Sequence, residues 1–597
     1  MFDRKFTIKG WLIVIGVILA QLIACTAPAD APAGAAARVA LPVVPREQTL
    51  IVMAGPANQY TQFNNHNPFT PSSSDAFHVG TLPAMYEPLI MFNVLTGEHE
   101  NWLAERWAYN ADFTELTLKL RASIKWNDGA PFTADDVVYS FNMNRDHAAG
   151  MVNLADVPAF LKEAVKVDDL TVKLVLKRPN PSFWATTLGT NHSPVVVPKH
   201  IWADKNPLEF TNFDLAAGLP VGSVPFKLVA ASPQQKVYDR RADWWAVETG
   251  FKPLPNVKRI IYLPQQAESQ AAQMMISNQL DMGPIMQVPT LKAVLAQNPK
   301  ITMFTGQKAP YGYLDWCPTE LNLNASEPPY NDKDIRWALN YAIDRAKLVE
   351  LAEAGAGVPA LHPFTPYAWF QPFGDALKAI FANYAYDTAA HLDKVNAIMA
   401  RKGYTKNTSG LWVDSRGATF AMNIYVPDWL RPYGPPLIQQ LRNAGFDATF
   451  DIAPGLASAV QTGVQRAALV CKGPSGVQGM DPYFMLSIYR TQYFRPTGEP
   501  APTWWATSRW QNTEYDALVE QMALLSPDDP KTMELFKQAM AIWIGELPDI
   551  FVAQLIIRYP MNTTYWTNWP TQDNVYGFPH SWQHNFMLTF INLQPVP

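Results

Sequence analysis

Apolar and polar residues alternate along parts of the chain in a pattern typical of strands. Residues 114–121 (TELTLKLR) place Leu116, Leu118 and Leu120 on one face, and residues 170–177 (LTVKLVLK) repeat the alternation. Because successive side chains of a strand point to opposite sides, this period predicts two half-buried strands.

A turn and a helix are predicted between these two strands. Asn127-Asp128-Gly129 has the composition of a tight turn. A helix then begins at Thr133, because Asp136 lies three residues further on and completes a capping-box pattern. Val137 and Phe141 fall on one face of this helix, and we expect both side chains to point into a core.

Two longer helical patterns occur later in the chain. The clearest helix is predicted from Asn331, which can cap it, to Gly355, which can end it. Another is predicted to begin at Asp529-Pro530. The predicted buried faces comprise Ile335, Ala338, Leu339, Ala342 and Ile343 in the first, and Leu535, Phe536, Ala539, Met540 and Trp543 in the second. Mixed strands and helices, with Pro-rich loops and no repeat period, predict an α/β or α+β protein of several lobes.

The first 25 residues have the pattern of an export signal. Arg4, Lys5 and Lys9 are followed by an apolar run at residues 11–20, which is too short to cross a bilayer as a lone helix. Leu22-Ile23-Ala24-Cys25 then resembles a lipobox, in which Cys25 is lipidated and becomes the first mature residue. The alternative is an uncleaved N-terminal anchor. Both predict a protein outside the cytoplasm and held at the membrane, in the periplasm or on the cell surface.

Composition narrows the class of protein. Residues 26–45 are rich in Ala and Pro and are predicted to form a tether. The remainder resembles a globular protein, with 48% apolar and 17% charged residues over the whole chain. Loss of residues 1–24 removes a net charge of +2 and changes the total from −5 to −7. The sequence has no basic run, so nucleic acid is not expected as a partner. It also has no second stretch of 18 apolar residues, so no further membrane span is predicted.

Cysteine and tryptophan usage adds two expectations. With Cys25 assigned to lipid, Cys317 and Cys471 remain in an oxidising compartment, where they can pair or stay as two buried thiols. The sequence leaves both possibilities open. The chain also contains 20 Trp, which supply flat, rigid and amphipathic surface.

Six segments in order resemble one protein family. The stretch from Ala104 to Phe141 is similar to the signature of extracellular solute-binding protein family 5, which includes oligopeptide, dipeptide, nickel and cello-oligosaccharide receptors. The other segments follow the family's order and are Tyr86-Glu87-Pro88-Leu89, 221–228 (VGSVPFKL), 241–245 (RADWW), 278–281 (NQLD) and 334–345 (DIRWALNYAIDR). Most of these residues build turns and core helices, so they indicate the fold and do not mark the ligand site.

The resemblance implies an α/β fold of the type II periplasmic-binding class, a two-lobed clamp that closes over a ligand by hinge motion. Scaled to the motifs, it implies a first lobe at 46–88, 218–309 and 562–597, an inserted domain at 89–217 and a second lobe at 310–561. It also implies a monomeric receptor that delivers a small molecule to an ABC permease whose ATPase is a separate subunit.

The cargo is predicted from one departure from the family's peptide receptors. These resemble one another in placing an aspartate, which pairs with the ligand's α-ammonium, about three residues before an acidic-Pro dipeptide. Here Asp481-Pro482 is the dipeptide, and Gln478 stands three residues before it. An ammonium without a counter-ion is costly to bury, whereas a neutral amide suits hydroxyl groups. This favours a neutral oligosaccharide, such as a cello-oligosaccharide, with an oligopeptide or dipeptide as the alternative.

Aromatic segments support the same cargo. Residues 565–569 (YWTNW) are similar to the corresponding segment of cello-oligosaccharide receptors, as are residues 63–69 (FNNHNPF). Sugar rings stack on aromatic planes, and amides bind their hydroxyls. The predicted ligand-binding residues are therefore Tyr565, Trp566, Trp569, Gln478 and Asn65, with Trp316, Trp369 and Trp504 as further candidates. The alternative for each Trp is a core position, which is the expectation for Trp107, Trp126, Trp337 and Trp543.

No catalytic constellation is apparent in the sequence. His580 and His584 have the spacing of a metal pair, but Phe578-Pro579 weakens the helix that such a pair needs. Residues 473–476 (GPSG) do not form a GxSxG elbow, and no phosphate-binding glycine loop occurs. We therefore expect no catalytic residue, metal or cofactor, and a secreted hydrolase stays as the remote alternative.

Overall fold

The computed structural model describes residues 41–53, 62–70, 80, 82–148, 151, 156–188, 194–473, 481–502, 506–581 and 584–597. The chain divides into two units, Met1–Val43 and Val44–Pro597, and every helix and strand of the described residues belongs to the second unit. The predicted signal and Cys25 lie outside the described residues, as does most of the predicted tether. Within the described residues, no helix combines the length and the apolar character that crossing a bilayer requires.

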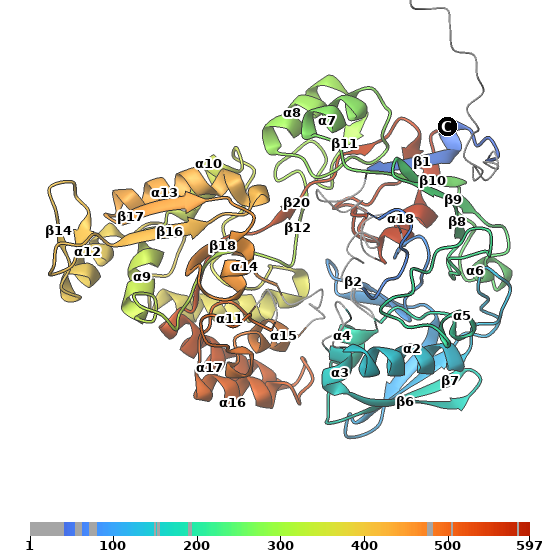
Figure 1. Cartoon of the computed structure of the whole chain (residues 1–597), viewed down its shortest axis with the longest axis horizontal. Coiled ribbons are helices and arrows are strands. Elements are labelled where there is room, and N and C mark those ends of the chain that lie inside the picture. Colours follow the sequence, from blue (N-terminus) through green and yellow to red (C-terminus); the bar gives the residue numbers. More distant parts are fainter. Residues whose placement is uncertain are drawn as a thin grey trace, which may run out of the picture. The chain divides into compact units, whose positions relative to one another are not determined.

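One four-stranded sheet, the first-lobe sheet, combines the start of the chain with residues 226–263 (Figure 1). Its order is β1 (Thr49–Met53), β10 (Arg259–Leu263), β9 (Gln235–Arg240) and β8 (Phe226–Ser232); β1 and β10 are parallel and the other pairs antiparallel. Around it lie η1 (Arg46–Gln48), α6 (Trp245–Glu248), α7 (Glu268–Ile276), α8 (Val288–Gln297) and α18 (Phe586–Asn592). Short pairs join β11 (Ile301–Thr302) to β21 (Met561–Asn562), and β22 (Trp566–Thr567) to β23 (Gln594–Pro595).

A second four-stranded sheet, the insert sheet, is antiparallel throughout. Its order is β4 (Ala104–Tyr109), β5 (Glu115–Leu120), β7 (Thr171–Leu176) and β6 (Leu161–Asp168). The helix α2 (Ala134–Asp146) packs against it, and the accompanying elements are β2 (Ile90–Asn93), β3 (Glu98–Asn101), α3 (Asp156–Phe160), α4 (Phe183–Thr187) and α5 (Lys199–Trp202). The predicted strands at 114–121 and 170–177 are confirmed as β5 and β7. The predicted capping box is also confirmed, with the side chains of Thr133 and Asp136 bonding each other's backbone.

The five-stranded second-lobe sheet is mixed. Its order is β17 (Asp447–Asp451), β16 (Ala421–Tyr425), β18 (Ala467–Cys471), β13 (Thr319–Leu323) and β19 (Asp549–Ala553). The pairs β17–β16 and β16–β18 are parallel, and β13 is antiparallel to both of its neighbours. Its helices are α9 (Lys333–Tyr341), α10 (Arg345–Ala352), η3 (Ala368–Phe370), α11 (Gln371–Ala382), α12 (Leu392–Arg401), η4 (Asp428–Tyr433), α13 (Gly434–Asn443), α14 (Leu456–Gln461), α15 (Tyr483–Ser487), η5 (Thr491–Tyr493), α16 (Thr513–Met522) and α17 (Pro530–Glu546), with the hairpin β14 (Thr405–Lys406) and β15 (Trp412–Val413).

The single helix predicted from Asn331 to Gly355 is wrong. The segment forms α9 and α10, which are separated by residues 342–344, and Asp332, not Asn331, caps α9. The break has a local cause, because the side chain of Asp344 accepts a hydrogen bond from the Lys347 backbone at 2.8 Å and starts a new helix. The predicted helix at Asp529-Pro530 is confirmed as α17, with Asp529 as its cap.

Two of the family-like segments meet at one buried carboxylate. Glu87 is 2% exposed and accepts hydrogen bonds from the indole N–H groups of Trp102, Trp244 and Trp245 at 3.0, 3.2 and 2.8 Å. Its backbone N–H donates to the hydroxyl of Ser223 at 3.1 Å. Burial raises the pKa of Glu87 to about 7, although these hydrogen bonds act in the opposite direction. The segments at 86–89 and 241–245 therefore have a structural role, because together they form a buried hydrogen-bonded cluster.

The chain crosses between the first-lobe sheet and the second-lobe sheet on two short strands. These are β12 (Tyr313–Leu314) and β20 (Ile556–Ile557), which pair antiparallel and run between the two bodies (Figure 1). Just beyond β12, Cys317 forms a disulfide with Cys471 at the end of β18, with a Cα–Cα distance of 5.2 Å. Each large sheet lies within one predicted region, while the lobe boundaries themselves stay a prediction.

Candidate ligand-binding site between the lobes

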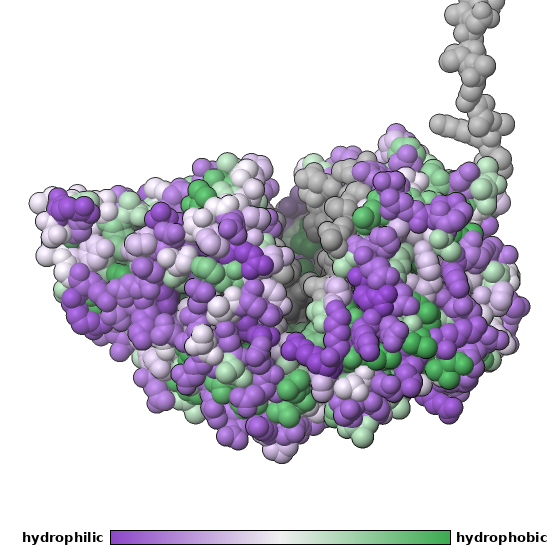
Figure 2. Space-filling view, turned by 60° about the horizontal axis from the view of Figure 1, so that its bottom comes forward, coloured by the Kyte–Doolittle hydropathy of each residue, from purple (hydrophilic) through white to green (hydrophobic). Residues whose placement is uncertain are grey.

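The surface is hollowed between the two bodies that β12 and β20 connect, and hydrophobic residues are visible inside the hollow (Figure 2). At the connection, Trp316 follows β12 and meets the rings of Phe578 and His580 edge-on, with centroids 6.0 and 6.2 Å apart. Tyr313 packs against the same two rings, and its hydroxyl bonds His580 Nδ1. These contacts join the crossing strand to the C-terminal segment and form a buried aromatic cluster, called here the aromatic wall, beside β12 and β20.

Trp316 also lies close to the end of the strand β18. It is 8% exposed, and a Cβ at Gly473 would lie 3.0 Å from its carbonyl oxygen, which is a tight contact. The absence of a side chain at Gly473 therefore allows the backbone there to approach Trp316 closely.

A buried carboxylate lies beside the aromatic wall. Asp315 precedes Trp316, is buried, and has no ion-pair partner among the residues that the structure describes. Its backbone carbonyl accepts a hydrogen bond from the Thr365 hydroxyl at 2.7 Å, and burial raises the pKa of its side chain to about 7. Opening this site to a cation would stabilise the charged form of Asp315.

A side-chain hydrogen bond connects the residue before α4 with the residues before α15. Ser182, just before α4, donates to the carboxylate of Asp481, and both residues are buried. Asp481 also accepts the backbone N–H of Tyr483 at 2.9 Å, and burial raises its pKa to about 6. The Asp481-Pro482 dipeptide therefore takes part in a contact that holds the two bodies together.

A cavity of about 480 Å³ lies next to this contact, lined by α4 and by residues of η3, α11 and α17. Its size falls within the range of small-molecule pockets. Trp369 contributes to it and also packs against the apolar cores of both bodies. The lining residues are Pro181, Ser182, Trp184, Ala185, Trp369, Pro372, Phe373, Ser526, Pro527, Asp528, Asp529, Pro530 and Met533, none of which is basic.

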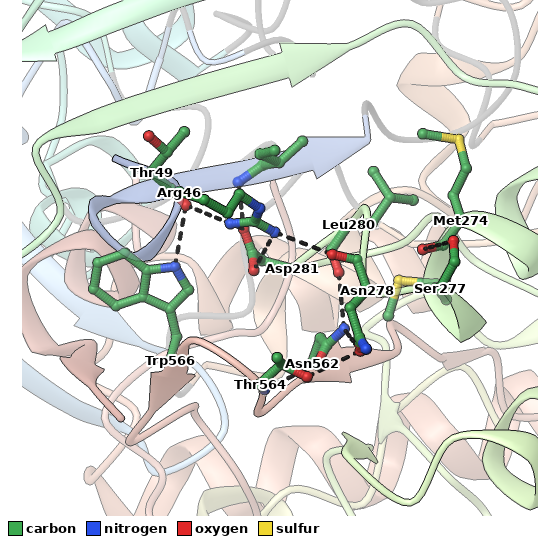
Figure 3. Close-up of polar contacts among 12 residues, drawn as sticks. Arg46, Thr49, Met274, Ser277, Asn278, Leu280, Asp281, Asn562, Thr564 and Trp566 are labelled. Carbon is green, nitrogen blue, oxygen red and sulfur yellow. Dashed lines mark hydrogen bonds and ion pairs between the residues drawn. The ribbon is translucent and has the colours of Figure 1, made fainter. Parts of the chain in front are cut away.

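The aromatic segment at 565–569 lies elsewhere, where the N-terminal end of the first lobe meets the C-terminal segment (Figure 3). Trp566 is 1% exposed and donates its indole N–H to the Thr49 carbonyl at 3.3 Å. Trp569 is 3% exposed and bonds the Asn562 carbonyl at 3.1 Å. In this conformation both occupy core positions, and their predicted contact with a ligand stays a prediction.

Tyr565 forms part of a cluster that fixes the start of β1. The Arg46 guanidinium lies 4.2 Å from the centre of the Tyr565 ring and forms two hydrogen bonds of 2.9 Å with Asp281 (Figure 3). Asp281, the last residue of the NQLD segment, is buried and also accepts the Ile51 backbone N–H at 2.7 Å. The cluster therefore attaches η1 to the elements around the first-lobe sheet.

The remaining predicted residues divide into two groups. Asn65 is half-buried, and its side chain bonds Gln62 at 3.1 Å and the Asn67 backbone at 3.0 Å. Gln478 and Trp504 lie outside the described residues, as does Cys25. Of the four tryptophans expected in the core, Trp126, Trp337 and Trp543 are buried, while Trp107 is half-buried.

The two histidines of the predicted pair contact different groups. His580 bonds Tyr313, and Nδ1 of His584 lies 3.2 Å from the Tyr86 carbonyl oxygen. No group of three or more His, Cys, Asp or Glu residues with metal-binding geometry occurs in the described part of the chain.

Sequence reasoning missed Ser182 and Trp184. They lie in a short segment (PSFWA) between predicted elements, without a periodic pattern or a family motif. Asp481 served only to locate Gln478. No local signal indicated that these residues meet Trp369 and the 526–533 loop.

Comparison with known proteins identifies the family. Residues 98–540 match the model of the bacterial extracellular solute-binding proteins, family 5. The chain belongs to this family. It is 24% identical to the dipeptide-binding protein of Escherichia coli K12 over 521 residues, covering 83% of this chain and 88% of that protein. It is also 24% identical to heme-binding protein A of Haemophilus influenzae over 502 residues, with coverages of 80% and 83%.

Solved structures of family 5 members show the same fold. The mannohexaose-bound periplasmic oligopeptide-binding protein of Thermotoga maritima has a TM-score of 0.75 at 23% identity, covering 93% of this chain and 99% of that one. The oligopeptide-binding protein of Bacillus subtilis, in complex with a nonapeptide, has a TM-score of 0.67 at 17% identity, with coverages of 92% and 99%. The predicted type II periplasmic-binding fold is thus confirmed, and the chain is a substrate-binding protein of an ABC importer.

Proposed function

We propose that this family 5 receptor captures a neutral oligosaccharide between its lobes and delivers it to a membrane permease. The observation that carries the proposal is the aromatic wall beside β12 and β20, where Trp316 lies against Phe578 and close to Gly473. A sugar ring can stack on an indole while an amide bonds its hydroxyls. The mannohexaose bound to the Thermotoga maritima relative is consistent with such a cargo.

An oligopeptide is the second candidate, and a different residue favours it. Asp315 is a buried carboxylate beside Trp316, and no described residue forms an ion pair with it. A peptide's α-ammonium would supply the missing positive charge. The relatives named for dipeptide and oligopeptide binding support this candidate. Sugar binding thus depends on Trp316, and peptide binding on Asp315.

Thermal shift of the full chain in detergent separates the two cargoes. Because a ligand that binds only the folded state stabilises it, cellopentaose or mannohexaose should raise the melting temperature, while pentaalanine should leave it unchanged. Trp316→Leu should weaken saccharide binding about tenfold, a loss of about 1.4 kcal/mol, and Asp315→Asn should leave it within twofold. Stabilisation by the peptide alone, abolished by Asp315→Asn, would overturn the oligosaccharide proposal. Release of shorter saccharides in the same samples would instead indicate a hydrolase.

We also propose that Cys25 carries the lipid anchor and that the Ala/Pro tether keeps the receptor near its permease. Tethering raises the effective concentration for docking without any new contact. Labelling cells with a fatty-acid analogue should mark the wild type, and Cys25→Ser should lose both the label and the membrane association. Equal labelling of the two proteins would contradict the anchor.

A further inference from the structure

The cavity next to the Ser182–Asp481 contact has aromatic walls from two separate bodies. Trp184 belongs to α4 of the inserted domain, while Trp369 and Phe373 belong to η3 and α11 of the second lobe. We propose that the inserted domain forms an outer subsite here, in which Trp184 and Trp369 hold a distal ring of an elongated saccharide. This inference rests on the proposed function and assigns part of the cargo site to the inserted domain.

Trp184 is held as a rigid platform. Trp107 stacks on it with a centroid distance of 4.9 Å and an angle of 20° between the rings. His99 lies 4.9 Å away, and Phe92 meets it edge-on at 6.3 Å. These rings support Trp184 from its own domain, and its remaining surface lines the cavity. A side chain fixed in this way loses little conformational entropy when a ligand stacks on it.

The opposite wall adds a ring and polar groups. Trp369 lines the cavity, while its indole nitrogen is closed off from solvent. Ser526 and the exposed Asp528, on the loop before α17, add groups that can bond sugar hydroxyls. The lining contains no Lys, Arg or His, which fits an uncharged ligand and not an anionic one.

The position of the cavity implies a dependence on ligand length. Tyr367 connects the two places, because its hydroxyl donates to the Leu314 carbonyl of β12 at 2.9 Å and the centre of its ring lies 6.4 Å from that of Trp369. A saccharide stacked on Trp316 must therefore extend past Tyr367 to reach Trp369 and Trp184. Short saccharides would occupy the hinge region alone.

Isothermal titration calorimetry with cello-oligosaccharides of two to six glucose units tests this subsite. Trp184→Ala should weaken binding of the hexasaccharide about tenfold and leave the disaccharide within twofold of the wild type. Trp369→Ala, on the opposite wall, should give the same length dependence, so the test does not rest on the folding of one variant. Trp429→Ala removes an exposed tryptophan that does not line the cavity and serves as the matched control.

The outcomes distinguish this inference from the proposed function. Suppose that the wild type binds saccharides, but that both cavity variants reduce the binding of the disaccharide and the hexasaccharide equally, or reduce neither. The outer subsite is then overturned, while the oligosaccharide receptor stands. If the wild type binds no saccharide of any length, the proposed function fails and the subsite fails with it.

Discussion

At the scale of single residues, the carboxylate of Glu87 joins segments that are far apart in the sequence. Trp102, Trp244 and Trp245 each donate an indole N–H to it, so one buried acid satisfies three buried donors. Removal of the carboxylate would leave these donors without an acceptor, and each lost partner is costly in the interior. We therefore expect the stability of the first lobe to respond strongly to changes at this position.

The raised pKa of Glu87 gives a pH dependence with a definite sign. Its pKa is about 7 in the folded protein, whereas an unperturbed glutamate has a pKa of 4.5, so the folded state binds the proton more tightly than the unfolded state. The contribution of Glu87 to stability therefore decreases as the pH rises from about 4.5 to about 7, by about 3–4 kcal/mol at 1.4 kcal/mol per pKa unit. Glu87→Gln removes this titration. The melting temperature of the wild type should fall relative to that of Glu87→Gln between pH 5 and pH 7.5, and a constant difference would contradict the assignment.

A substitution can test whether Trp566 stabilises the core or contacts the ligand. It is buried and bonds the Thr49 carbonyl, so Trp566→Ala should cost about 3–5 kcal/mol by leaving a cavity in the core. The melting temperature without ligand should fall accordingly, while saccharide affinity, measured well below the melting temperature, should stay within twofold. Trp316→Leu should show the reverse, with a large change in affinity. A large loss of affinity in Trp566→Ala, with little loss of stability, would instead support the predicted ligand contact.

At the scale of elements, the sequence predicted those whose cause is local. The strands β5 and β7 follow from alternation, and α2 and α17 follow from a cap followed by an apolar face. The segment 331–355 was harder, because the apolar period continues through residues 342–344, where the helix breaks. An aspartate inside a periodic pattern is compatible with an exposed helical position or with a new N-cap, and tertiary contacts decide between them.

Those contacts are visible around α10. The Arg345 guanidinium is buried and donates to the Phe551 carbonyl of β19 at 2.7 Å, which fixes the start of the helix against the second-lobe sheet. Asp344→Ala should therefore lower the stability of this lobe by about 1 kcal/mol, whereas Asp344→Asn should keep most of the cap. Urea unfolding of the two variants provides the measurement. Equal loss in both would indicate that the charge of Asp344 matters and the cap does not.

At the scale of the whole molecule, the candidate site could not be predicted from local patterns. The cavity combines residues near 182, 369 and 528, and the Ser182–Asp481 bond joins positions 299 residues apart. Periodicity reports which face of an element is buried, but it does not report which elements face each other. The family resemblance supplied the two-lobed architecture, and Trp369 was the one candidate that the structure places in this cavity among the residues it describes.

The Ser182–Asp481 bond should influence how readily the two bodies separate. A hydrogen bond to a carboxylate contributes about 1.5–3 kcal/mol, so its loss should favour open conformations about tenfold or more. Ser182→Ala should increase the radius of gyration measured by small-angle X-ray scattering without ligand. It should also weaken the binding of every saccharide by a similar factor, because the closed state would be less populated. Ser526→Ala, which removes another hydroxyl from the same cavity, is the matched control and should leave the radius of gyration unchanged. If Ser182→Ala matches the control, this bond does not govern closure; if it weakens only long saccharides, Ser182 acts as a ligand contact in the outer subsite.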